Sequence, residues 1–189
     1  MVYLATCDGP FSLDDLAARI RKSSNFRVSW QFYQCGGIDP RSPAIIRQAL
    51  EAIIATPELN KFLQESFEPM YAEAFEVEPL HEHCRVEAAA SEFENILARA
   101  ASDHLGAYSR QLRDATAAEK QEIKELFGCI GEYRAYELLP GSVAGCPACR
   151  NLNNHLFSSW FFGVAWDWCL FALWPRRNVL WVCCLTDTD

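Results

Sequence analysis

The amino-acid sequence predicts an α+β fold, with several N-terminal and central helices packed on a small, mainly antiparallel sheet. Two observations support this prediction. Segments with apolar residues at helical spacing come first along the chain, and segments typical of strands come mostly late. Near the C-terminus, two long apolar runs, Ala165–Trp174 and Val179–Leu185, flank the turn-forming residues 175–178 (Pro-Arg-Arg-Asn). These runs are rich in aromatic and branched side chains and predict an antiparallel aromatic hairpin.

This C-terminal hairpin is predicted to lie at the centre of the core. Neither run alternates between apolar and polar residues, so both faces are expected to be covered, as in central strands. A rival interpretation is a membrane span over Leu156–Trp174, with Arg176 and Arg177 as a positive flank. Asp167 within that segment, and tryptophans spread along it instead of gathered at its ends, argue against a span.

The N-terminal third is predicted to contain helices and one strand. A capping-box-like sequence begins at Ser12, and apolar residues at helical spacing continue to about Lys22. The next segment alternates between apolar and polar residues and predicts a half-buried strand, with inward side chains from Phe26, Val28, Trp30 and Phe32. Proline at the first helical position then favours two further helices, beginning at Pro43 and Pro57.

The central part of the chain predicts more helix, then a strand. The spacing of apolar residues predicts a long helix over Cys84–Arg113, with Leu112 on its buried side. A capping box at Thr116 predicts another helix to about Phe127, and alternation over Glu132–Leu139 predicts a strand. There is no internal repeat or low-complexity linker, so residues 1–189 are predicted to form a single domain.

Composition narrows the class of protein. Half of the residues are hydrophobic and 13% are aromatic, which argues against disorder. The N-terminus has no basic region followed by an apolar run, so no signal peptide is expected. The nine cysteines are odd in number and irregularly spaced, which favours reduced thiols in a cytoplasmic protein. Cys183 and Cys184, adjacent on a predicted strand, are expected to point to opposite faces.

Negative charge is concentrated in the middle of the chain. The formal net charge is −8, and residues 57–105 hold eleven acidic and three basic residues, which accounts for all of it. This balance argues against direct binding of nucleic acid. Residues 62–84, here called the acidic segment, contain no lysine or arginine and interleave glutamates with aromatic residues.

Two interpretations of the acidic segment are open: a solvated helical face with its aromatics turned inward, or a patch that binds a basic protein. Dense like charges repel one another and lower stability, which favours the second interpretation. The candidate partner-binding residues are Glu65, Glu68, Tyr71, Glu73, Glu76, Glu78 and Glu82.

The most motif-like sequence is Cys146-Pro-Ala-Cys149. Two thiolates at this spacing can bind one zinc ion or form a redox pair. His81 and His83 are candidate further zinc ligands, but the spacing matches no standard zinc motif and a second CxxC is absent. Ordinary buried or loop cysteines are the third interpretation. There is no serine-hydrolase, Walker or dinucleotide-binding motif, so no catalytic residue and no cofactor other than this zinc is predicted.

The general character of the chain resembles the immunity proteins of bacterial competition systems, whose toxins are delivered by contact-dependent or type VI secretion. The residues behind this resemblance are the tail, from Trp166-Asp167-Trp168 to Leu185-Thr-Asp-Thr-Asp189, and the acidic segment. The resemblance implies tight binding to one cognate toxin, often a basic nuclease, whose active site is occluded. We therefore expect an inhibitor without turnover in the cytoplasm, with no membrane partner. The alternative is a zinc- or thiol-dependent enzyme, or a zinc-stabilised regulator, centred on Cys146 and Cys149. A third interpretation is an inhibitor that mimics nucleic acid and uses the acidic segment against a different basic target.

Overall fold

A computed structural model of the chain describes residues 3–23, 27–36, 43–54, 56–66, 84–89, 92–105, 111–140 and 166–187. Within these residues the strands are β1 (Tyr3–Cys7), β2 (Arg27–Gly36), β3 (Cys84–Ala88), β4 (Arg134–Pro140), β5 (Trp166–Trp174) and β6 (Val179–Asp187). The helices are α1 (Phe11–Ser23), α2 (Pro43–Ile54), α3 (Pro57–Ser66), α5 (Glu92–Ala101) and α6 (Ala117–Gly128). The α+β class is therefore confirmed.

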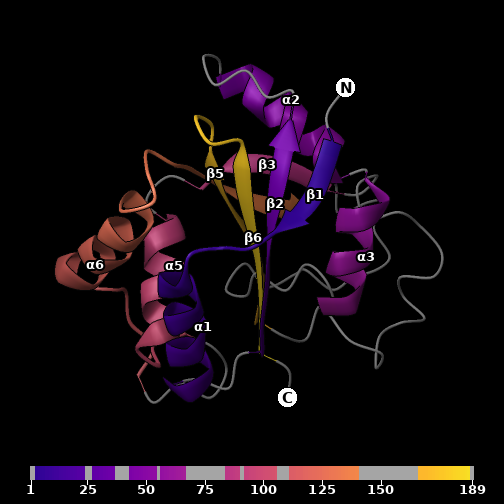
Figure 1. The fold of residues 1–189 in the computed structure, drawn as a ribbon. Coiled ribbons are helices and arrows are strands. Elements are labelled where there is room, and N and C mark those ends of the chain that lie inside the picture. Colours follow the sequence, from indigo (N-terminus) through magenta and orange to yellow (C-terminus); the bar gives the residue numbers. More distant parts are fainter. Residues whose placement is uncertain are drawn as a thin grey trace.

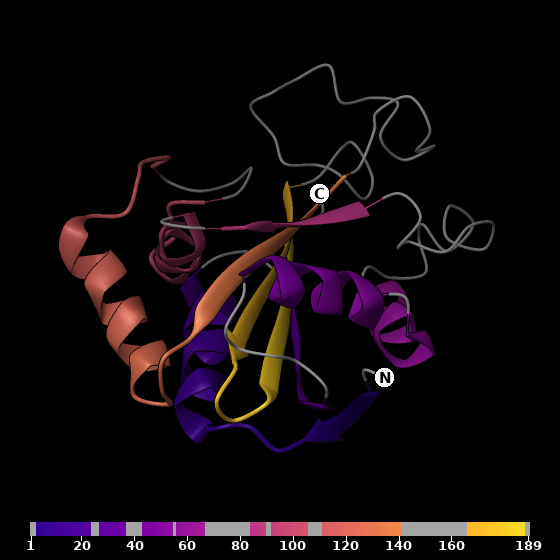
Figure 2. The ribbon, with the colours of Figure 1, turned by 90° about the horizontal axis from the view of Figure 1, so that it is seen from above.

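The strands form one six-stranded antiparallel sheet in the order β1-β2-β6-β5-β4-β3. Helices α1, α5 and α6 pack on one face of the sheet, and α2 and α3 pack on the other (Figures 1 and 2). Two separate clusters of buried side chains result. We call the cluster beneath α1, α5 and α6 the first core, and the cluster beneath α2 and α3 the second core.

The C-terminal hairpin occupies the centre of the sheet, as predicted. β5 and β6 are neighbours in the middle of the strand order, and their side chains alternate between the two cores. Cys183 lies in the first core and Cys184 in the second, which confirms that the two face opposite ways. The turn places Asn178 at φ 53, a left-handed conformation that asparagine tolerates better than most residues.

Several N-terminal predictions are confirmed, and one needs correction. Helices α1, α2 and α3 begin within a residue of their predicted starts. In β2, Val28 and Phe32 are buried in the first core, but Tyr33 and Cys35 are also buried, in the second core. The C-terminal half of this strand is thus covered on both faces, because α2 and α3 pack over it. The edge strand β1 was not predicted.

The predicted long helix over Cys84–Arg113 is wrong. Its first residues form β3, which pairs with β4, and of its described residues only Glu92–Ala101 is helical. Val86 is buried against the second core as part of a strand. Helix α5 ends where Asp103 takes φ 57, and Leu112, predicted to be buried, is 57% exposed. The alanines that end and follow β3 have high helical propensity and favour a helix over this region. The pairing of Cys84–Ala88 with β4 makes these five residues a strand in spite of that local preference.

The described part of the segment considered as a membrane span is Trp166–Trp174, and it forms strand β5. Among the described residues there is no helix long and apolar enough to cross a membrane.

Candidate functional site

Most of the residues proposed from the sequence as site residues lie outside the described part of the chain. Glu65 lies in helix α3, but its side chain is not described. The other candidates outside the described residues are Glu68, Tyr71, Glu73, Glu76, Glu78, Glu82, His81, His83, Cys146 and Cys149. Both the partner-binding assignment and the zinc assignment therefore remain predictions. Among the described residues, no group of three or more histidine, cysteine, aspartate or glutamate side chains is arranged to hold a metal ion.

The structure assembles acidic side chains at the β3 edge of the sheet, and β3 follows the acidic segment in the sequence. Glu87 of β3 is the direct antiparallel partner of Glu137 in β4. Directly opposed residues of antiparallel strands project to the same face, with Cβ atoms about 4.5–5.5 Å apart. Glu92, at the start of α5, also acts on Glu137 electrostatically. We call Glu87, Glu92 and Glu137 the carboxylate cluster.

Glu137 is the residue most affected by this arrangement. It follows Tyr133 and Ala135 on the face of β4 that packs against the first core, so helix α5 partly covers it. Burial, followed by the charges of Glu92 and Glu87, raises the pKa of Glu137 from 4.5 to about 7. All three effects disfavour the ionised form. Ionisation of Glu137 therefore costs free energy in the folded protein.

Tyr133 precedes strand β4, and its side chain contacts Glu94 of helix α5. The Tyr133 hydroxyl donates a 2.6 Å hydrogen bond to Glu94 Oε1, and burial together with this carboxylate raises the pKa of Tyr133. Both residues line a hollow of about 400 Å³ that also includes Lys124 and Arg134. A hollow of this volume can accommodate a side chain of a partner protein.

A second hollow, of about 590 Å³, lies near the start of α1 and the paired strands β1 and β2. Asp8, Asp14 and Trp30 are among its lining residues. The Trp30 indole N–H donates a 3.2 Å hydrogen bond to Asp14, and the Arg21 guanidinium lies 4.7 Å from the Trp30 ring centroid. The indole thus already contacts a cation of its own chain.

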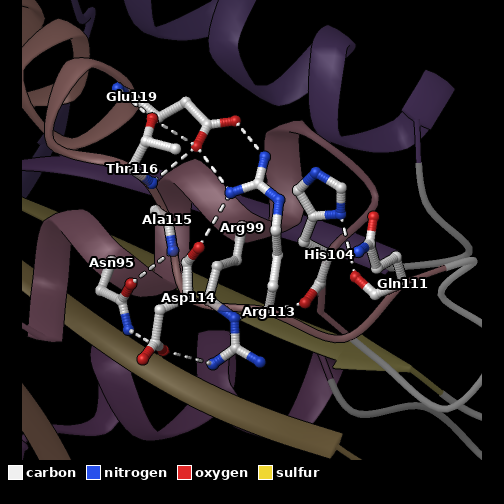
Figure 3. A network of polar contacts seen from close by, with 9 residues as sticks. All are labelled: Asn95, Arg99, His104, Gln111, Arg113, Asp114, Ala115, Thr116 and Glu119. Carbon is white, nitrogen blue, oxygen red and sulfur yellow. Dashed lines mark hydrogen bonds and ion pairs between the residues drawn. The ribbon is translucent and has the colours of Figure 1, made fainter.

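A polar network fixes α5 relative to α6 (Figure 3). Asn95, which is buried, donates a hydrogen bond to Asp114 Oδ1 at 3.3 Å and accepts one from the Ala115 backbone N–H at 3.0 Å. Arg113 donates two hydrogen bonds to Glu119, of 2.9 and 2.8 Å. Each of these groups is paired with a protein partner, so the network supports the fold and leaves no side chain poised for chemistry.

The sequence does not predict the carboxylate cluster, because the spacing of apolar residues puts Glu87 and Glu92 in one long helix. The signal that could have revealed the cluster is the alternation Arg85-Val86-Glu87-Ala88, which matches the alternation over Tyr133–Leu138. Two half-buried strands with this pattern can pair so that Glu87 and Glu137 face each other.

Comparison of the chain with known proteins adds no identification. A search finds no family whose sequence model matches it and no curated protein with significant similarity.

Proposed function

We propose that the protein is an immunity-type inhibitor, which binds a cognate basic bacterial toxin in the cytoplasm and occludes its active site. The observation that supports this proposal is the carboxylate cluster. Glu137 is held, partly buried, beside Glu87 and Glu92 at a cost in stability, and a cationic partner would relieve that cost. Residues that lower the stability of the free protein but favour a complex are typical of binding surfaces.

The cluster adjoins the acidic segment in the sequence. That segment runs directly into β3, whose third residue after Cys84 is Glu87. The proposed contact surface therefore combines the acidic segment with the exposed side chain of Glu87 and its neighbours at the β3 edge. Negative charge concentrated there would steer a basic partner into the complex and set its orientation. Aromatic side chains interleaved in the segment would supply apolar contacts.

The partner can be identified by a pull-down from the native host, with the purified protein as bait, at low and then high salt. The proposal predicts recovery of one basic protein in stoichiometric amount, released by salt because exposed charges are screened. Inhibition of that protein's enzymatic activity by the purified bait would establish neutralisation. Recovery of no protein, together with bound zinc or a reactive thiol at Cys146 and Cys149, would instead favour the enzyme or zinc-regulator alternative.

Charge reversal tests the contact surface. Glu73→Lys, Glu76→Lys and Glu78→Lys combined should weaken partner binding by more than tenfold while the thermal unfolding transition remains cooperative. The matched control combines Asp15→Lys, Glu122→Lys and Glu125→Lys, at exposed positions of α1 and α6 with the same change in charge. Affinity should be measured by calorimetry. Equal weakening in the two triple variants would contradict the assignment of the acidic segment.

A further inference from the structure

Two cysteines face each other at the centre of the sheet. Cys169 of β5 and Cys184 of β6 are direct antiparallel partners, and both lie in the second core with at most 1% exposure. Their Sγ atoms are 3.9 Å apart. They are thus thiols in contact, at the midpoint of the hairpin around which the sheet is built.

The backbone at this pair is compatible with a covalent bond. Directly opposed residues in antiparallel strands have Cα atoms about 4.5 or 5.5 Å apart, according to their hydrogen-bonding position. Disulfides span Cα separations of about 4.4–6.8 Å. Rotation of the two side chains with a small approach of the strands would therefore bring the sulfur atoms to bonding distance without a change of register.

No other described cysteine can compete for either partner. Cys183 is adjacent to Cys184 but points into the first core. Cys35 lies in the second core, but its Sγ contacts the carbonyl of Asn178 in the turn before β6, six residues from Cys184 and so about 20 Å away along an extended chain. Cys129 is exposed at the end of α6, and Cys7 lies on the edge strand β1.

We propose that Cys169 and Cys184 are a latent cross-strand disulfide, which closes when the protein folds in the presence of a small-molecule disulfide. One thiolate attacks the oxidant to form a mixed disulfide and releases one small thiol. The second thiolate then attacks the mixed disulfide and releases the other, so two electrons pass to the oxidant and each cysteine loses one proton. Because both sulfurs are buried, the exchange takes place before the second core closes over the hairpin. This inference is independent of the proposed function.

The bond would change how the hairpin behaves on unfolding. It would link the two central strands across the turn and so restrict the unfolded chain, which raises the stability of the folded state. A protein expected to contain only reduced thiols would then tolerate an oxidising compartment with its fold intact. Cys183, whose pKa is raised by burial, would remain a free thiol in the first core.

Peptide mapping tests the proposal on the unmodified sequence. The full chain is unfolded, refolded in a mixture of reduced and oxidised glutathione, trapped with an alkylating agent under denaturing conditions, digested and analysed by mass spectrometry. The expected result is one dominant cross-linked pair of peptides containing Cys169 and Cys184, with Cys183 alkylated. Alkylation of both Cys169 and Cys184 throughout, or linkage of either to another cysteine, would overturn the proposal.

Two alanine variants provide a matched comparison. Cys184→Ala and Cys183→Ala remove neighbouring buried thiols of the same strand, so their packing costs should be similar. In the unmodified protein and in Cys183→Ala, oxidation should raise Tm by several degrees. In Cys184→Ala, Tm should be the same in oxidised and reduced samples. An oxidation-dependent rise in Tm that persists in Cys184→Ala would contradict the assignment. If either variant fails to fold, the peptide mapping on the unmodified chain still tests the proposal.

Discussion

At the scale of single residues, Glu137 is a described carboxylate whose pKa is clearly raised by its surroundings. An alternating strand places it on the face toward the first core, and the antiparallel register places Glu87 opposite it. Burial contributes most to its raised pKa, and the neighbouring charges of Glu92 and Glu87 add to it. Glutamate side chains are exposed in most proteins. The partly buried position of Glu137 therefore reflects the pairing of β3 with β4 and not a local preference.

The raised pKa of Glu137 predicts a pH dependence of stability. The folded protein holds the proton more tightly than the unfolded chain, since the pKa rises from 4.5 to about 7. The stabilising contribution is therefore fully present below about pH 4 and is lost as the pH rises through about 7, with a total on the order of 3 kcal/mol. Glu137→Gln should remove this dependence and raise stability at pH 8.

The free energy of unfolding is measured with urea at pH 5 and at pH 8. The change between the two pH values is then compared between the unmodified protein and Glu137→Gln. Glu132→Gln is the control, because the Glu132 side chain is 68% exposed and makes one loose ion pair, with Arg176 at 3.6 Å. If the free energy of unfolding changed between pH 5 and pH 8 by the same amount in Glu137→Gln as in Glu132→Gln, the prediction would be contradicted.

At the scale of elements, helix α6 is fixed at its N-terminus by a complete capping box. The Glu119 backbone N–H donates to Thr116 Oγ1 at 3.3 Å, and the Glu119 carboxylate accepts from the Thr116 backbone N–H at 2.7 Å. The hydrogen bonds from Arg113, then those from Thr116, hold the pKa of Glu119 well below its usual range. The helix start was predicted from sequence because all of these interactions except that of Arg113 lie within one turn.

Replacement of the N-cap residue Thr116 tests how much the cap contributes to the stability of the folded protein. Thr116→Ala removes the hydroxyl that accepts from the helix backbone and should lower the free energy of unfolding by about 1 kcal/mol. Thr116→Ser keeps the hydroxyl and should lie close to the unmodified protein. Guanidinium unfolding of the three proteins at pH 7 provides the measurement. Equal losses in Thr116→Ala and Thr116→Ser would show that the methyl group, and not the cap, stabilises the helix.

At the scale of the whole molecule, one sheet separates two cores of buried side chains. Aromatic rings close the first core: Phe127 stacks on Trp174 at a centroid distance of 5.9 Å and meets Trp181 edge-on at 5.1 Å. The net charge of −8 opposes this compact arrangement through repulsion. The fold is therefore stabilised from within by apolar burial and weakened at its surface by like charges.

Salt dependence of stability follows from the whole-molecule charge. An increase in sodium chloride from about 20 mM to about 300 mM screens repulsion between exposed carboxylates and should raise Tm by a few degrees. In a variant combining Glu73→Gln, Glu76→Gln and Glu78→Gln, the rise should be smaller, since fewer like charges remain. Scanning calorimetry measures both proteins. A fall in Tm with salt would mean that surface ion pairs outweigh the repulsion.

The sequence predicted those parts of the fold whose signals are local. The capping box at Thr116, the prolines at Pro43 and Pro57, and the uninterrupted apolar runs of the hairpin each act within a few residues, and each is confirmed. Strand β3 was missed because its five residues precede an alanine-rich stretch and are strand only through pairing with β4, about fifty residues later in the chain. The partner-binding and zinc residues lie outside the described part, and remain predictions.

The amino-acid sequence by itself determined the class of the fold, the central hairpin and the concentration of negative charge, because propensity, periodicity and composition are properties of neighbouring residues. The tertiary structure alone decided which distant side chains meet. The pairing of Glu87 with Glu137 and of Cys169 with Cys184 depends on strand register, which is set by burial on both faces of the sheet at once. A shift of one residue in the β3–β4 register would put Glu87 and Glu137 on opposite faces, and the same shift in the β5–β6 register would separate Cys169 from Cys184.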